Sequence, residues 1–129
     1  MHLNVEIVTP EKSAWSGTAD EVVLPAWEGQ QGVYPEHDQL LALLRGGVCT
    51  VRNSEGERRW IVGRGFAEIG PDRVTLLTDS CDPVDGIDKA AAQKDLADAE
   101  AALAQCAAGS EAERLARITQ ELAQARLDA

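Results

Sequence analysis

The chain has 129 residues, a formal net charge of -10 and a sequence pI near 4.5. This length fits one domain, or one domain with an appendage, and it is sufficient for a hydrophobic core. The acidity argues against DNA or RNA as a partner, because phosphate backbones are bound by clustered Lys and Arg side chains. No apolar run approaches about 18 residues, so we expect no segment to insert into a membrane.

The three cysteines, Cys49, Cys81 and Cys106, are widely spaced and form no Cys-x-x-Cys pair. This pattern predicts reduced thiols in a cytosolic setting. The two histidines, His2 and His37, lie far apart in the chain and neither has a second ligand at metal-binding spacing. We therefore expect no metal site.

Short apolar segments separated by turn residues fill the first eighty residues. At residues 3–8, Leu3, Val5 and Ile7 recur at every second position, which predicts a half-buried strand. Further strands are expected at 14–19, 21–25, 48–52, 58–62, 66–69 and 74–78, with a brief extended piece within the loop at 27–37. The connections at 53–56 and 70–73 contain glycine and are typical of hairpins. This spacing predicts an antiparallel β-sandwich or barrel.

The core of this front region is expected to consist mainly of Val, Leu and Ile, because aromatic residues are few. The run Leu40-Leu-Ala-Leu-Leu44 is too short for a helix and ends at two glycines, so we interpret it as a buried strand. Trp60 lies within an expected strand and is assigned to the core, whereas Trp27 lies in a loop and is assigned to the surface.

The last third of the chain changes from a period of two to a period between three and four. Residues 80–86 are expected to form a linker, and residues 88–106 consist almost entirely of strong helix formers. A second helix is expected after the break at 108–110. Gly109 suits the end of a helix, and Ser110 with Glu113 has the spacing of a capping box. The fold class is therefore α+β with segregated parts: a β-sandwich domain at 1–84 and an α-helical hairpin at 85–129.

The apolar seam between the two expected helices is thin. It is expected to contain Leu96, Ala99, Leu103 and Cys106 from the first helix and Leu115, Ile118, Leu122 and Ala125 from the second. Each large side chain contributes at most about 1.5–3 kcal/mol when fully buried. We therefore expect the hairpin to lean on some other surface and to be able to leave it. A permanently docked tail remains an equal alternative.

Two further readings of the whole chain stay open at this point. His37 with Glu36 and Asp38 has the residue types of an acid–base cluster, so a small cytosolic enzyme is one alternative. A non-catalytic adaptor that uses the sandwich and the hairpin as binding surfaces is the other.

The segment Glu28-Gly-Gln-Gln-Gly-Val-Tyr-Pro-Glu-His-Asp-Gln-Leu-Leu41 resembles a signature of the epsilon subunit of bacterial F-type ATP synthases. That signature reads Glu-Gly-x-x-Gly-(Ile/Val)-Tyr-Pro-x-His-x-x-Leu-Leu. The opening Leu3–Glu11 and the segment Trp60–Thr78 are also similar to the family pattern. The resemblance covers essentially the whole chain, and it implies a sandwich of about ten strands followed by a helical hairpin.

The resemblance also implies a non-catalytic rotor subunit of the central stalk, which couples the proton-driven c-ring and the gamma subunit to the catalytic head. Its location would be peripheral, on the cytoplasmic face of the inner (plasma) membrane. By position, the loop Glu28-Gly29-Gln30-Gln31 would face the c-ring, and Gln30 stands where many relatives have an acidic residue. Thr9, His37, Leu41 and Ala42 would lie on the side that faces gamma.

For the hairpin, the resemblance implies a regulatory part that can contact the alpha and beta subunits of the head and inhibit ATP hydrolysis. Arg114, Arg117 and Arg126 are the candidates for that contact, with solvated pairing to Glu113 and Glu121 as the alternative. Some relatives bind ATP through (Ile/Leu)-Asp-x-x-Arg-Ala. Here Ile87 and Asp88 are present, but Ala91 replaces the Arg and removes a strong phosphate donor. Lys89 or Lys94 could compensate only in part, so no cofactor is expected.

Overall fold

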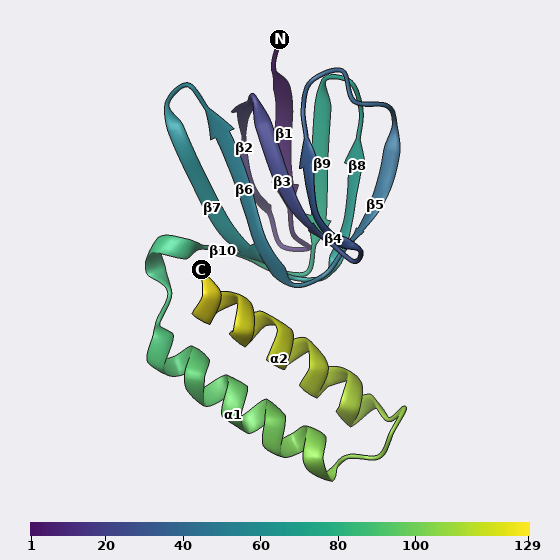
Figure 1. Ribbon diagram of the computed structural model, residues 1–129, viewed down its shortest axis with the longest axis vertical. Helices are drawn as coiled ribbons and strands as arrows, with labels where there is room; N and C mark the ends of the chain where they lie inside the picture. Colours follow the sequence, from purple (N-terminus) through teal and green to yellow (C-terminus); the bar gives the residue numbers. More distant parts are fainter.

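The computed structural model describes all 129 residues as a strand-rich body with two helices packed below it (Figure 1). The strands are β1 Leu3–Val8, β2 Ser13–Ala19, β3 Glu21–Ala26, β4 Gly29–Val33, β5 Leu40–Leu44, β6 Gly47–Asn53, β7 Gly56–Val62, β8 Gly65–Ile69, β9 Arg73–Thr78 and β10 Cys81–Pro83. A short 3-10 helix, η1 (Val84–Gly86), leads into α1 (Lys89–Gln105) and α2 (Glu111–Asp128). Neither α1 nor α2 combines the length and the apolarity needed to cross a membrane.

All ten strands belong to one strongly curved sheet with the order β10-β7-β6-β3-β5-β8-β9-β1-β2, and β4 pairs with β3 beside this path. The predicted antiparallel sandwich is confirmed, with one exception in the strand pairing. β1 runs parallel to β9, with Val5 opposite Val74 and Ile7 opposite Leu76. The expected linker at 80–86 contains β10, which pairs with β7.

The core of the sandwich follows from the alternation of side chains along each strand. Leu3, Val5 and Ile7 of β1 point inward and are at most 2% exposed, and Val74 and Leu76 of β9 meet them. A cluster of 17 buried residues fills the space between the strands, and every member lies between Leu3 and Leu76. The body therefore has a core of its own, to which the helices contribute nothing. Trp60 is buried in it, as predicted, and Trp27 is 47% exposed.

The interpretation of residues 40–44 as a buried strand was wrong in one respect. They form β5, but only Ala42 and Leu44 point into the core. Leu41 and Leu43 are 62% and 63% exposed on the other face, whereas Leu40 shares the face of Ala42 and is 44% exposed because it begins the strand. An unbroken apolar run does not distinguish a strand buried on both faces from one whose outer face is left for a partner.

The helical hairpin begins and ends as the sequence predicts. The Asp88 side chain caps α1 by accepting a hydrogen bond from the Ala91 backbone N–H. Gly109 has a φ of 78° between the helices, and Ser110 Oγ accepts from the Glu113 N–H at 3.1 Å. Glu113 in turn accepts from the Gly109 N–H. These contacts satisfy backbone groups that a helix end would otherwise leave unpaired.

The seam of the hairpin agrees with the predicted one at Ala99 and differs at the larger side chains. Its buried residues are four alanines at seven-residue spacing, Ala92 and Ala99 in α1 and Ala116 and Ala123 in α2. Leu96, Leu103, Ile118 and Leu122 are only half-buried, and Leu115 is 52% exposed. Small side chains let two helices approach closely, so the larger residues are displaced to the margins of the contact.

Candidate functional site

An exposed apolar row crosses four neighbouring strands on the outer face of the sheet. Strand register places Leu43 of β5 opposite Phe66 of β8, Phe66 opposite Leu77 of β9, and Leu77 opposite Val8 of β1. Leu43 is 63% exposed and Phe66 is 37% exposed, while Leu77 and Val8 are half-buried. We call these four residues the apolar row. Contiguous exposed apolar side chains of this kind mark an interaction site.

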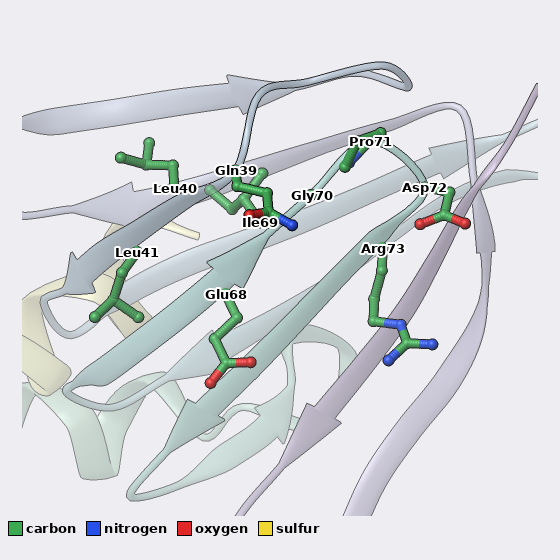
Figure 2. A pocket seen from close by; sticks show the side chains of 9 residues that line it. All are labelled: Gln39, Leu40, Leu41, Glu68, Ile69, Gly70, Pro71, Asp72 and Arg73. Carbon is green, nitrogen blue, oxygen red and sulfur yellow. The ribbon is translucent and has the colours of Figure 1, made fainter.

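A more polar row lies beside the apolar row on the same outer face. It runs from Leu41 through Glu68 and Thr75 to Glu6, in successive strand register. Figure 2 shows Leu41, Glu68 and Arg73 projecting from β5, β8 and β9 around a shallow cavity of about 580 Å³. The outer face therefore combines exposed leucines with carboxylates, which suits a partner that offers apolar side chains flanked by basic ones.

The residues expected to face gamma are spread around this outer face. Leu41 lies on it, but the Ala42 side chain points into the core and is only 8% exposed. Thr9 follows Val8 at one end of the apolar row. His37 lies on the β4–β5 turn at the other end of the face, where the neighbouring Glu36 N–H donates to the Pro71 carbonyl at 2.6 Å. The structure thus places Thr9 and His37 at opposite ends, with Leu41 between them.

His37 does not form the acid–base cluster considered above. Its Nδ1 lies 2.6 Å from the backbone carbonyl of Asp38, and no hydrogen bond joins its ring to the side chain of Glu36 or Asp38. A general acid–base pair requires direct or water-mediated contact between the two groups. The structure therefore offers no specific support for an enzyme site at this turn.

The turn that carries His37 is tied to the sheet through Tyr34. The Tyr34 hydroxyl donates a hydrogen bond to the Glu21 carboxylate, which also accepts from Arg52 at 2.6 Å. Both donors stabilise the ionised form, so they lower the pKa of Glu21, with the Tyr34 bond the larger cause. The same bond raises the pKa of Tyr34 above its usual value.

The residues expected to face the c-ring form the tip of the β3–β4 hairpin. Glu28, Gly29 and Gln30 are exposed and Gln31 is half-buried. Ala26 pairs with Gly29, so Trp27 and Glu28 make the turn, and Gly29 has a φ of 126°. Four consecutive polar or small residues at an exposed tip can reach a partner without disturbing the core.

Two arginines beside this tip were missed from the sequence. The guanidinium carbons of Arg45 and Arg64 lie 5.5 Å and 5.1 Å from the centroid of the Trp27 ring, within the range of a cation–π interaction. Arg45 lies on the β5–β6 turn and Arg64 on the β7–β8 turn. Each arginine is adjacent to glycine in the sequence, but that pattern alone does not show that the two turns meet at Trp27.

The three arginines expected to contact the catalytic head occupy different environments on α2. Arg114 forms two hydrogen bonds to Glu111, at 2.8 Å and 3.1 Å, and Arg117 is exposed. Arg126 is half-buried and lies 3.9 Å from Asp82 and from Asp95. The alternative pairing with Glu113 and Glu121 was wrong, because Glu113 caps α2 and Glu121 contacts the sandwich.

The degenerate nucleotide motif lies at the open end of the hairpin. Ile87 and Asp88 line a cavity of about 320 Å³ together with Ala91, Asp95 and Arg126. Lys89 points elsewhere: its Nζ donates to the backbone carbonyls of Arg126, Leu127 and Ala129 at 2.8–2.9 Å. The cavity thus holds one arginine, which is already near two carboxylates, and Lys89 is engaged at the end of α2.

Comparison with known proteins gives a consistent result. A family model of the β-sandwich domain of the ATP synthase delta/epsilon chain matches residues 2–84. The ATP synthase epsilon chain of Granulibacter bethesdensis is 47% identical over 102 residues, which cover 78% of this chain and 76% of that relative. The epsilon chain of Thermosynechococcus vestitus is 36% identical over 129 residues, which cover 98% of this chain and 91% of that relative.

A solved structure shows the same fold at lower sequence identity. One chain in the cryo-EM structure of Euglena gracilis mitochondrial ATP synthase, which comprises OSCP, F1 and the c-ring, superposes with a TM-score of 0.81 and 21% identity. The match covers 95% of this chain and 78% of that chain, so it includes both the strands and the helices.

Proposed function

The chain belongs to the family of ATP synthase epsilon chains, and we propose that it is a non-catalytic subunit of the rotor of a proton-translocating F-type ATP synthase. In this role it joins the gamma subunit to the c-ring and couples their rotation to the catalytic head. Its location is peripheral, on the cytoplasmic face of the inner membrane.

The single observation that supports this role best is the outer face of the sheet. The apolar row presents Leu43 and Phe66 to solvent, next to the exposed Leu41. Strand register fixes these side chains on a rigid support, so a partner can bury them at little conformational cost. We assign this face to gamma, with Thr9 and His37 at its two ends. The exposed tip Glu28–Gln31 is assigned to the polar loops of the c-ring.

Binding of the purified full chain to the gamma subunit tests the assignment. Phe66→Ala should weaken binding by at least about tenfold, because truncating an aromatic anchor in the centre of an interface removes much of the binding energy. Leu115→Ala on α2 is the matched control, since Leu115 is also exposed but lies on the hairpin. If Phe66→Ala binds gamma as tightly as Leu115→Ala does, the apolar row is not the gamma interface.

The hairpin is proposed to regulate ATP hydrolysis by contacting the alpha and beta subunits. Arg117 is exposed on α2, and Arg114 is exposed although it is paired with Glu111. Exposed ion pairs contribute little to stability, so Arg114 can exchange Glu111 for an acidic partner on the head. This predicts a weak inhibitor whose effect decreases when Arg114 and Arg117 are replaced by Gln.

We further propose that the hairpin of this chain does not use ATP as an effector. Phosphate would have to enter a cavity lined by Asp82, Asp88 and Asp95, with Arg126 as its only basic residue. Calorimetric titration of the full chain with MgATP should show no saturable heat in the micromolar range. Saturable binding that Arg126→Gln abolishes would contradict this proposal.

A further inference from the structure

Glu121 of α2 occupies an unusual position for an acidic residue of an otherwise exposed helix. Its side chain is only 8% exposed and meets the sandwich at the turns after β5 and β7. Oε2 accepts hydrogen bonds from the Gly46 backbone N–H at 2.9 Å and from Arg64 Nε at 3.0 Å. Oε1 lies 3.4 Å from Arg45 Nε. A carboxylate buried to this extent is stable only with such donors around it.

These contacts form the principal joint between the two parts of the molecule. Glu121 accepts both of the hydrogen bonds that connect the helices to the strands, and the remaining ion pair, Arg126 to Asp82, is longer at 3.9 Å. A shallow cavity of about 540 Å³ lies beside the joint, between α2 and the strands. Figure 1 shows that α2 lies between the ends of the strands and α1, so α1 packs against the far side of α2.

The same two arginines lie against Trp27 at the base of the β3–β4 tip. Glu121 holds both guanidinium groups from the hairpin side, and the Trp27 ring lies within 5.5 Å of both. Without the carboxylate, two like charges would remain close together with no counter-charge. Glu121 of the hairpin therefore helps to position Arg45 and Arg64 against Trp27.

We propose that Glu121 is a latch that holds the hairpin against the sandwich. Through Arg45 and Arg64, which lie against Trp27, it also restrains the tip of the β3–β4 hairpin. Release of α2 withdraws the carboxylate and loosens the tip; a partner that moves the tip weakens the hold on α2 in return, as linkage requires. The latch itself depends only on the contacts within this chain. Its consequence for the c-ring rests on the proposed function, which assigns the tip to that partner.

Amide hydrogen exchange of the full chain tests the latch. Glu121→Gln keeps the shape of the side chain but leaves both arginines without a counter-charge, so exchange in α2 should accelerate by about tenfold to a hundredfold. Glu111→Gln is the matched control, because it removes a glutamate–arginine pair on the same helix that forms no hydrogen bond or ion pair with the sandwich. Equal exchange in the two variants would overturn the proposal.

A second variant reaches the joint from the other side and leaves Glu121 in place. A Cβ at Gly46 would lie 2.9 Å from Glu121 Oε2 and 3.2 Å from Leu122 Cδ2, which is too close for the docked helix. Gly46→Ala should therefore also accelerate exchange in α2. Unchanged exchange in the core strands β1 and β9 shows that the sandwich remains folded in each variant. If Gly46→Ala leaves α2 protected, the docked joint described here is wrong.

Acrylamide quenching of tryptophan fluorescence tests the effect on the tip. Glu121→Gln should increase the quenching constant, and the increase should disappear in the Trp27→Phe background, which leaves only Trp15 and Trp60. Faster exchange in α2 without a change in quenching would overturn the link to Trp27. Gamma binding, measured on the same samples, distinguishes failure of the latch from failure of the proposed function. If the wild-type chain does not bind gamma, the proposed function is contradicted and the latch result still stands.

Discussion

At the scale of single residues, the sequence indicates which side chains are special but not which partners they find. Tyr34 is part of the signature segment, yet its hydrogen bond to Glu21 spans 13 positions, and Glu21 also binds Arg52, 31 positions away. Such pairings depend on strand register, which local patterns do not fix. The same applies to Trp27, whose surface position was predicted while its two arginines were not.

Tyr34 is the only tyrosine of the chain, so its titration can be followed directly by tyrosinate absorbance. The Glu21 carboxylate raises the pKa of Tyr34, because it stabilises the protonated phenol and repels the phenolate. Replacing Glu21 with Gln should therefore lower the midpoint towards the usual value for tyrosine, and Glu111→Gln should leave it unchanged. An unaltered midpoint in Glu21→Gln would show that the bond does not persist in solution.

The pKa shifts in this cluster also predict how stability depends on pH. The pKa of Glu21 is lowered in the folded protein, so its contribution is present above the usual carboxyl pKa and is lost as the pH falls through the lowered value. The pKa of Tyr34 is raised, so its contribution is present below the usual phenol pKa and is lost as the pH rises through the raised value. The hydrogen bond between Tyr34 and Glu21 thus stabilises the folded state at pH values between the carboxyl and phenol pKa values.

The three cysteines should differ in reactivity. Burial raises the pKa of the Cys49 thiol to about 12. The pKa of the Cys81 thiol is raised to about 11, mainly by burial and secondly by the negative charge of Asp82. Since the thiolate is the reactive form, alkylation of the folded chain near neutral pH should modify Cys106 first, followed by Cys81 and then Cys49. Peptide mass spectrometry after brief iodoacetamide treatment gives the order. Labelling of Cys49 before Cys106 would contradict the burial described here.

At the scale of elements, the sequence predicts which segments form strands and helices better than it predicts what they bury. The break between the helices was predicted correctly because Gly109 and Ser110 act through contacts only a few residues away. Of the predicted seam only Ala99 is buried, because periodicity identifies a face of a helix, whereas the two helices make contact through the smallest side chains of that face. For β5, the apolar run correctly predicts a strand. It does not predict that the outer face is exposed, because apolar residues on that face are explained only by a partner that the sequence does not contain.

The alanine seam makes a specific prediction about size. Ala99 is 4% exposed between the helices, so Ala99→Leu should separate α1 from α2 and destabilise the hairpin by about 1–3 kcal/mol. Ala101→Leu introduces the same side chain at an exposed position of the same helix and should cost little. Urea unfolding followed by helical circular dichroism compares the two. Equal stability of both variants would mean that Ala99 does not lie in the seam.

At the scale of the whole molecule, the body and the hairpin are joined by few contacts. The sandwich buries its own core, so its fold class and most of its strands could be predicted from alternation, turn spacing and the family resemblance. The contacts that dock the hairpin could not be predicted, because they depend on Glu121 meeting the Gly46 N–H, Arg45 and Arg64, which lie 57 to 76 positions away. The resemblance supplied the partners and the roles of the two parts, and the structure supplies the contacts that connect them.

The central claim is that the sandwich alone binds gamma, whereas the hairpin is needed only for regulation. The most direct test is gamma binding by the full chain and by a chain that ends after Gly86, which retains every residue of the core cluster. We predict equal affinity for gamma, together with a changed rate of ATP hydrolysis when the shortened chain is assembled into the enzyme. Loss of gamma binding on removal of residues 87–129 would contradict the account.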